Sequence, residues 1–249
     1  IEAHRKWTTH TNRIIADTQG NIAYMLSGQV PIRKNNVPNL FPVPGWTGEH
    51  EWIGEIPFED MPRDVNPKAH YLNTSNNLIV SYDFPYYINA TGTPYRGQRV
   101  KELLQNNNQH NISSFAKIQM DTFSIPGLNL TKRIKDIVPN TENGIKAKNL
   151  LATWDGNLSF ESYGSIYEIL RWRIQVNILN RIRDVMIGEK PAEDTLRVHM
   201  TALEYLICSD DNSIFESNIF PYTNWDDCLS KSLDEVGEFM SEKLGDDSK

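Results

Sequence analysis

The spacing of hydrophobic and polar residues predicts different structures on either side of residue 96. Before it, short apolar runs are interrupted by most of the chain's 13 prolines. Two β-rich runs, Arg13–Asp17 and Asn21–Ser27, flank Thr18-Gln19-Gly20 and predict a β-hairpin whose turn uses a glycine with positive φ. A further strand is predicted over residues 71–82.

Beyond residue 96 the apolar positions recur every three or four residues, as is typical of amphipathic helices. Helices are predicted over 96–107, 111–123 with serine caps, 162–191, 192–208 and 225–244. Gly188 and Pro191 are expected to end the longest of them. We therefore expect an α+β chain with a sheet and loop portion at 1–95 and a mainly helical portion at 96–249. A hairpin with one further strand leaves sheet edges unpaired, so other strands are expected to complete the sheet.

The formal net charge of −7 argues against binding to nucleic acid or to an anionic membrane, because both need clustered cations. No apolar run approaches the roughly 20 residues that span a bilayer, and residues 1–10 lack the apolar core of a signal peptide. Cys208 and Cys228 are the only cysteines, and the sequence is compatible with two buried thiols or with one disulfide.

Few residues show a spacing that is specific to one chemistry. The six histidines are scattered without a metal-binding motif, and no glycine-rich phosphate loop or Gly-x-Ser-x-Gly motif is present. The carboxylates at Glu51, Glu55, Glu59 and Asp60 could be offered as an acid and base pair of glycosidase type, but no distant second acid is identified by the sequence.

The segment Asn73-Thr74-Ser75-Asn76-Asn77 offers a different chemistry. A primary amide can donate a hydrogen bond to a developing oxyanion without gaining or losing a proton, as acyl transfer requires. By itself, however, this segment is more typical of asparagines that cap a turn after a strand.

Four strings resemble the penicillin acylase (penicillin amidase) family of N-terminal-nucleophile hydrolases in their order and spacing. They are ADTQGNIAYMLSGQVPIR at 16–33, PVPGWTGEHEWIGEIPFEDMPRDVNP at 42–67, YLNTSNN at 71–77 and PYRGQRVKELL at 94–104. The resemblance implies part of an αββα sheet followed by a mainly helical region. It also implies an amide hydrolase that cleaves acyl amides through an acyl-enzyme.

In this family the nucleophile is an N-terminal serine whose α-amine acts as the base. Ile1 has no hydroxyl or thiol, so the serine is expected on a segment upstream of this chain. The chain is accordingly expected to be an internal fragment of the large (β) chain that is not active alone. Its expected partners are the remaining segments of the same processed precursor, namely the small α chain and the serine-bearing part of the β chain, and a small acyl-amide substrate.

Carried over position by position, the resemblance assigns catalytic roles to two residues. Asn76 corresponds to the asparagine that donates to the oxyanion, and Arg96 to the active-site arginine that organises the nucleophile's surroundings. Arg99, one turn further along, is expected to be structural. The tyrosine-rich loop between Asn76 and Arg96 is expected to return the chain to the site.

Other implications of the resemblance are less specific to these residues. No cofactor is expected for catalysis, and the structural calcium ion common in the family would take most of its ligands from outside this chain, with Asp83 not a convincing ligand. His50 stands where the family often has an aromatic residue. The resemblance implies an extracytoplasmic location, but the sequence does not identify the particular acyl amide that is cleaved.

Two functions are alternatives to an amide hydrolase. One is a catalytically inactive homologue, and the other is a carbohydrate- or peptide-binding module built on Trp46, Trp52 and Phe58.

Overall fold

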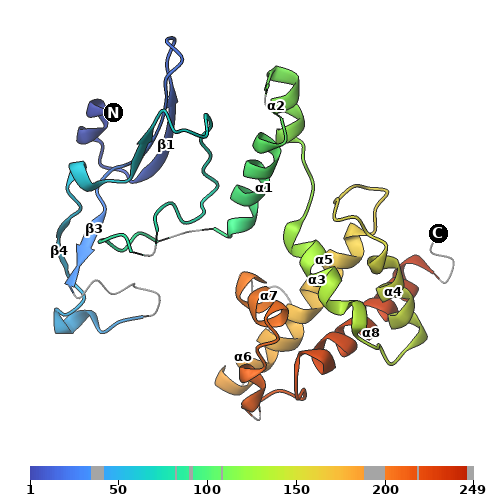
Figure 1. Ribbon diagram of the computed structural model, residues 1–249. Coiled ribbons are helices and arrows are strands. Elements are labelled where there is room, and N and C mark those ends of the chain that lie inside the picture. The colour runs from blue at the N-terminus through green and yellow to red at the C-terminus, as the bar shows by residue number, and fades with distance from the viewer. Residues whose placement is uncertain are drawn as a thin grey trace. The chain divides into compact units, whose positions relative to one another are not determined.

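The structure is a computed structural model that describes residues 1–34, 42–81, 83–89, 92–107, 109–187, 200–217 and 219–245. Contacts group the chain into two compact units, Ile1–Gln119 (unit 1) and Met120–Lys249 (unit 2). The named strands all lie before residue 66, and the first α-helix begins at Pro94 (Figure 1). The domain boundary expected at residue 95 stays a prediction. The contacts divide the chain later, between residues 119 and 120, so that two helices belong to the same unit as the strands.

Unit 1 contains a three-stranded and a two-stranded antiparallel sheet. The strands are β1 Thr11–Ala16, β2 Ile22–Ser27, β3 Pro31–Arg33, β4 Trp52–Glu55 and β5 Arg63–Val65, paired in the orders β1-β2-β5 and β3-β4. The predicted hairpin is confirmed as β1 and β2. Its turn has Gly20 at φ +87°, and the Asp17 carboxylate accepts the backbone N–H groups of Gln19 and Asn21 at 2.9 and 2.8 Å.

The core of unit 1 lies on β2 and the segments that follow β4. Its buried members are Tyr24, Leu26, Ile56 and Met61, and Val30, Ile32, Leu72, Ile79, Tyr86 and Ile88 pack against them. The sequence did not predict β3, β4 or β5 as strands. Each has only three or four residues, too few for an alternating pattern to stand out.

The strand predicted over residues 71–82 is wrong for residues 71–81, where the structure has bends and extended loop; Tyr82 lies outside the described residues. Local side-chain hydrogen bonds take the place of a strand ladder here. The Asn77 amide accepts from Ser75 N at 3.1 Å and donates to Leu78 O at 3.0 Å, while Asn73 Nδ2 donates to Gly97 O at 2.8 Å. Asparagine favours such local bonds over regular structure, and the apolar residues of the segment alone do not reveal this.

Two helices complete unit 1, α1 Pro94–Gln105 and α2 Ile112–Gln119, as predicted. Pro94 stands in the first turn of α1, where its missing N–H costs nothing. The cap of α2 differs from the serine cap expected, because Asn111 Oδ1 accepts Ser114 N and Ser114 Oγ accepts Asn111 N, both at 2.9 Å.

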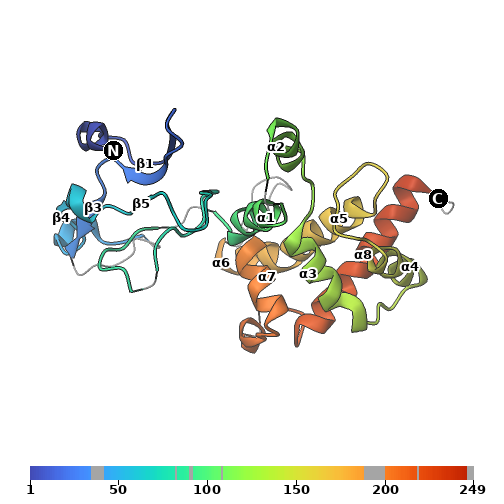
Figure 2. The same cartoon turned by 45° about the horizontal axis from the view of Figure 1, so that its top comes forward.

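Unit 2 is helical around one core. Its helices are α3 Ile125–Arg133, α4 Glu142–Ala152, α5 Gly164–Gln175, the π-helical stretch Val176–Asn180, α6 Arg181–Ile187, α7 Met200–Cys208 and α8 Trp225–Leu244. Helix α8 packs against α4 and α5 (Figures 1 and 2). Fully buried side chains from these elements, among them Trp225, Tyr167, Leu170 and Leu233, form the core.

The predicted helix over 225–244 is confirmed as α8. The one over 162–191 forms α5, the π-helical stretch and α6, while its expected stop at Gly188 and Pro191 lies outside the described residues. Of the helix predicted over 192–208, only Met200–Cys208 is described. Helices α3 and α4 were not predicted, although Ser124 and Thr141 cap them by accepting from Gly127 N and Gly144 N.

Cys208 and Cys228 are free thiols, which excludes the disulfide, but the expectation of two buried thiols is wrong for Cys208, which is exposed. Cys228 is buried in the core of unit 2, and burial raises the pKa of its thiol to about 12. A thiol with such a pKa is unreactive near neutral pH.

Within the described ranges, no helix combines the length and the apolar character that crossing a membrane requires.

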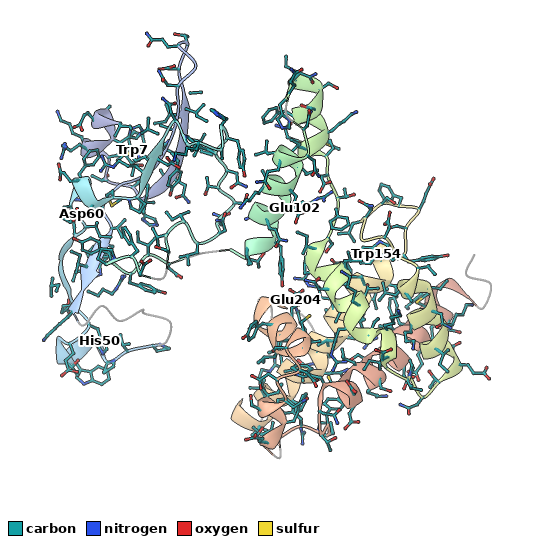
Figure 3. The ribbon with its side chains drawn as sticks, in the orientation of Figure 1. Trp7, His50, Asp60, Glu102, Trp154 and Glu204 are labelled. Carbon is teal, nitrogen blue, oxygen red and sulfur yellow. The ribbon has the colours of Figure 1, made fainter. Side chains whose placement is uncertain are left out.

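Glu204 on α7 is a buried carboxylate of unit 2 (Figure 3). Burial raises the pKa of Glu204, and the charge of Arg171, whose Nε lies 3.6 Å from Glu204 Oε1, offsets this only in part. The folded state therefore binds this proton more tightly than the unfolded state. The contribution of Glu204 to stability falls as pH rises from its unfolded pKa, about 4.3, through its higher folded pKa.

We expect Glu204→Gln to remove this dependence, since a neutral amide of the same shape has no charge to bury. The difference in thermal unfolding midpoint between the variant and the wild type should shift in favour of the variant as pH rises from 4.5 to 7.5. The exposed Glu242→Gln serves as the control and should follow the wild type. A difference for Glu204→Gln that stays constant with pH would contradict the account.

Candidate functional site

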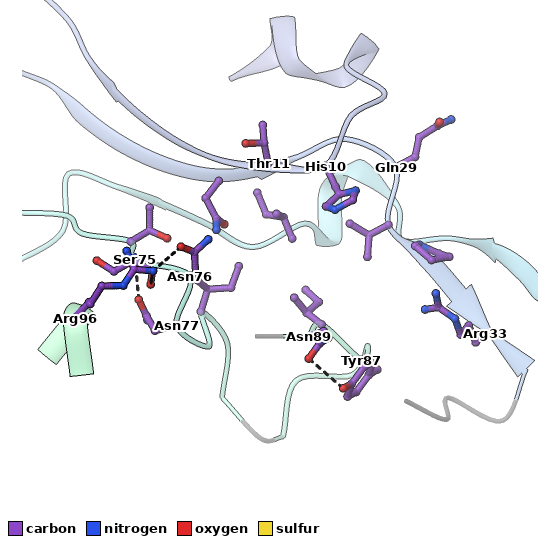
Figure 4. A pocket seen from close by; sticks show the side chains of 17 residues that line it. His10, Thr11, Gln29, Arg33, Ser75, Asn76, Asn77, Tyr87, Asn89 and Arg96 are labelled. Atoms are coloured by element: carbon purple, nitrogen blue, oxygen red, sulfur yellow. Dashed lines mark hydrogen bonds between the residues drawn. The ribbon is translucent and has the colours of Figure 1, made fainter. Parts of the chain in front are cut away.

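A pocket of about 670 Å³ in unit 1 is the candidate site (Figure 4). Its walls come from the start of β1, the end of β2, the β2–β3 connection and β3, residues 74–79 and 87–89, and the first turn of α1. This volume is within the range of small-molecule sites, roughly 300–1,000 Å³. Asn76 and Arg96, the two residues expected to be catalytic, both line it.

Asn76 is held in an uncommon backbone conformation, with φ +64°. Asparagine tolerates this left-handed region better than most residues. Gly92 lies against it, since Gly92 N donates to Asn76 O at 2.8 Å and a Cβ at Gly92 would lie 2.8 Å from Asn76 Cβ. A side chain at position 92 would therefore displace Asn76.

Arg96 fixes the orientation of the Asn76 side chain from the first turn of α1. Its Nη2 donates to Ser75 O at 2.9 Å and to Asn76 Oδ1 at 2.7 Å (Figure 4). A guanidinium only donates, so the amide atom beside it is the oxygen. The Asn76 Nδ2 group keeps its two N–H donors, for which the described part of the chain shows no acceptor.

The position of Asn76 therefore depends on a loop and not on the strand that the sequence predicted. Gly97 on α1 lets this loop approach closely, because a Cβ there would lie 2.7 Å from Asn77 Oδ1. The tyrosine-rich return is anchored at Tyr86, whose hydroxyl donates to Asp60 Oδ2 at 2.7 Å. Arg99 does not line the pocket and contacts Glu102 at 3.5 Å.

The charged side chains that line the pocket are cationic. They are Arg33 and Arg96, accompanied by the imidazole of His10, and the lining residues that the structure describes include no carboxylate. This composition contrasts with the net charge of −7 for the whole chain. The sequence analysis did not single out Arg33, although Pro31 and Arg33, two residues apart on β3, share the face that lines the pocket.

The other candidate chemistries find less support in the geometry. Glu59 accepts a hydrogen bond from Arg5 at 2.7 Å, which lowers the pKa of its carboxyl, and Asp60 accepts from Tyr86. These two of the four carboxylates suggested for an acid and base pair are thus surface groups with partners in the chain, and the other two, Glu51 and Glu55, are also exposed.

A metal site finds no support among the described residues either. Nowhere in the described ranges do three His, Cys, Asp or Glu side chains converge as metal ligands would. Asp83 is exposed, and a hydrogen bond from Ser81 lowers the pKa of its carboxyl. The structural calcium ion, with most of its ligands outside this chain, stays a prediction.

The three aromatic residues offered as a binding platform lie in separate environments. Phe58 is contacted by two guanidinium groups, those of Arg5 and Arg63, at 4.1 and 4.8 Å from its ring centroid. The ring of Trp52 faces Arg33 at 5.9 Å, while Trp46 is 88% exposed. His50 is half-buried in the segment between Trp46 and Trp52.

Comparison with known proteins gives consistent matches. The family model of penicillin amidase matches residues 1–249. Penicillin acylase 2 proenzyme of Pseudomonas sp. (strain SE83) is 29% identical over 93% of this chain and 30% of its own length. The acyl-homoserine lactone acylase QuiP of Pseudomonas fluorescens (strain Pf0-1) is 29% identical over 64% of this chain and 21% of its own length.

Among solved structures, a thermostable penicillin G acylase from Alcaligenes faecalis superimposes with a TM-score of 0.69. It is 16% identical, and the match covers 98% of this chain and 49% of that one. The likeness confirms the predicted α+β fold of N-terminal-nucleophile hydrolase type. The chain spans about 30% of the length of the first of these relatives.

Proposed function

The chain belongs to the penicillin amidase family, and on that premise we propose that it forms part of an amide hydrolase that cleaves acyl amides through an acyl-enzyme. One observation carries the proposal. On the wall of a pocket of about 670 Å³, Arg96 holds the oxygen of the Asn76 amide at 2.7 Å and leaves the amide N–H groups as donors. A donor of fixed orientation in a pocket is what stabilises a tetrahedral oxyanion.

The proposed reaction uses a serine on another segment of the same protein. Its hydroxyl oxygen attacks the amide carbonyl while the serine's own α-amine accepts the proton, which suits an amine with a pKa of about 7.7–8.0. The carbonyl oxygen becomes an oxyanion and accepts a hydrogen bond from Asn76 Nδ2. Collapse breaks the C–N bond, the amine leaves with a proton from the ammonium, and water then hydrolyses the acyl ester.

Arg96 serves as a positioning residue in this scheme. An unrestrained amide could rotate by 180° and turn its oxygen toward the oxyanion, which would repel it. The bond from Arg96 Nη2 to Asn76 Oδ1 opposes that rotation, and its charge polarises the amide so that the N–H groups become stronger donors.

The proposal includes the partners and the location. Asn76 and Arg96 would meet the serine-bearing part of the β chain and the small α chain of the same processed precursor, in line with the name proenzyme of one relative. An extracytoplasmic location follows from the family resemblance. The substrate would be a small acyl amide.

The test is an assay of the complete, processed protein with a panel of acyl anilides. We expect release of the amine, with an initial burst and an acyl adduct on a serine detected by mass spectrometry after rapid quenching. Absence of both amine release and adduct across the panel would refute the proposal and favour the inactive homologue.

A further inference from the structure

We propose that a second pocket of unit 1, of about 300 Å³, binds a zwitterionic amino acid with an apolar side chain. This second pocket contains neither Asn76 nor Arg96, and it shares only Leu26 and Gln29 with the candidate functional site. The inference therefore goes beyond the proposed function and does not depend on it.

Three segments that lie far apart in the sequence form the second pocket. They are residues 4–8, the end of β2 with the turn that follows it, and the end of β4 with the segment after it, and the lining residues from the last two are Leu26, Gly28, Gln29, Glu55, Ile56, Phe58 and Met61. The volume of about 300 Å³ lies at the lower end of the range for small-molecule sites, roughly 300–1,000 Å³. Such a pocket suits a ligand of the size of a single amino acid.

Contacts between these segments hold the second pocket open without a ligand. Arg5 joins the first segment to the third, because its Nη1 lies 2.7 Å from Glu59 Oε1 and its guanidinium lies 4.1 Å from the centroid of the Phe58 ring. The first and second segments are joined where Gln29 N donates to Thr8 O at 3.1 Å. A preformed pocket binds its ligand at a lower cost in conformational entropy.

Two opposite charges on the wall of the second pocket are unpaired. Arg5 is engaged by Glu2 and Glu59. Within the described part of the chain, the side chains of Lys6 and Glu55 form no hydrogen bond or ion pair, either with each other or with a third residue. Single unpaired charges are common on protein surfaces, but these two line the same small pocket. A ligand that carries both an ammonium group and a carboxylate satisfies both of them at once.

The buried part of the lining favours a ligand that also has an apolar side chain. Leu26, Ile56 and Met61 line the second pocket and are buried members of the core of unit 1. Trp7 lines it as well and is exposed to solvent in the absence of a ligand. An apolar side chain on the ligand would remove part of this surface from water, which glycine or another small zwitterion does not do.

The experiment compares an amino acid with two analogues that each lack one charge, by titration calorimetry on the complete protein. One set is L-leucine, L-leucinamide and 4-methylpentanoate, and the other is L-phenylalanine, L-phenylalaninamide and 3-phenylpropionate. A pH of 6.5 keeps the α-amines protonated. In at least one set, we expect the wild type to bind the amino acid about 5- to 10-fold more tightly than either analogue.

Two variants should separate the two charges. Lys6→Gln should lose the preference for the amino acid over the amide and keep the preference over the deaminated acid. Glu55→Gln should show the reverse pattern. Loss of fold would weaken the binding of all three ligands together, so this crossed pattern identifies the two charges as the binding groups.

The matched controls are Lys68→Gln and Glu49→Gln, which change exposed charges outside the second pocket and should keep wild-type affinities. Arg96→Met tests whether the ligand lies in the candidate functional site instead. Loss of amino-acid binding in that variant would overturn the inference. So would a wild type that binds neither amino acid, or unchanged preferences in both Lys6→Gln and Glu55→Gln.

Discussion

Replacing Asn76 by alanine is expected to lower kcat of the complete enzyme about 10²- to 10³-fold, the usual loss when one donor to an oxyanion is removed. KM should change much less, because Nδ2 gains its full value only when the carbonyl oxygen carries charge. The measurement is steady-state hydrolysis of a neutral acyl anilide. Alanine adopts a φ of +64° less readily than asparagine, so a stability loss of about 1 kcal/mol is also expected.

Two further variants separate the chemical effect from the structural one. Asn76→Asp keeps a residue that tolerates this backbone conformation but replaces the donor with an acceptor, so activity should fall at least as far as in the alanine variant. Asn89→Ala removes another amide that lines the same pocket, one whose oxygen accepts from Tyr87 at 3.4 Å, and should stay near wild-type activity. Near-normal turnover in Asn76→Ala, or an equal loss in Asn89→Ala, would contradict the oxyanion role.

A milder result is expected for the positioning residue. Arg96→Met removes the bond to Asn76 Oδ1 and leaves the amide in place but free to rotate. Because only part of the amide population then presents its N–H groups, kcat should fall by less than in Asn76→Ala. The double variant should be little worse than Asn76→Ala alone, since the two residues act as one unit.

The sequence predicted the parts of this site whose geometry is set by neighbouring residues. The β1–β2 hairpin depends on Gly20 and Asp17, and α1 begins at a proline, so both can be recognised from local pattern. The assignment of Asn76 and Arg96 rested on resemblance, and the structure brings their side chains together across 20 residues of chain. Nothing in the spacing of the two residues requires that contact.

What the sequence missed depends on contacts between distant segments. Residues 71–81 contain enough β-branched and apolar residues to suggest a strand, but strands need a neighbour, and here the asparagine amides and Gly97 hold a loop in place. Arg33 stands in a strand of three residues that exists because Trp52 lies opposite it. Its place in the pocket wall follows from that pairing, which no local pattern encodes.

Helix α8 packs so closely against α4 that adding a single methyl group at Gly237 is expected to destabilise unit 2. A Cβ at Gly237 would fall on the carbonyl group of Asn143 and lie 2.5 Å from Gly144 N, so backbone must move to admit it. One turn earlier, the buried Asp234 accepts the backbone N–H groups of Asn140 and Thr141 at 3.2 and 2.9 Å, which ties the same two helices together.

Gly237→Ala is therefore expected to destabilise unit 2 by about 2 kcal/mol, within the range of about 1–3 kcal/mol for overpacking. In a helix without tertiary contacts the same change would stabilise by about 1 kcal/mol, so the sign of the effect identifies the cause. The thermal midpoint should fall by roughly 4–8 °C. Glu238→Ala, at the exposed next position of α8, is the control and should stay within about 0.5 kcal/mol of wild type. An unchanged or raised midpoint for Gly237→Ala would mean that the two helices do not touch through these glycines.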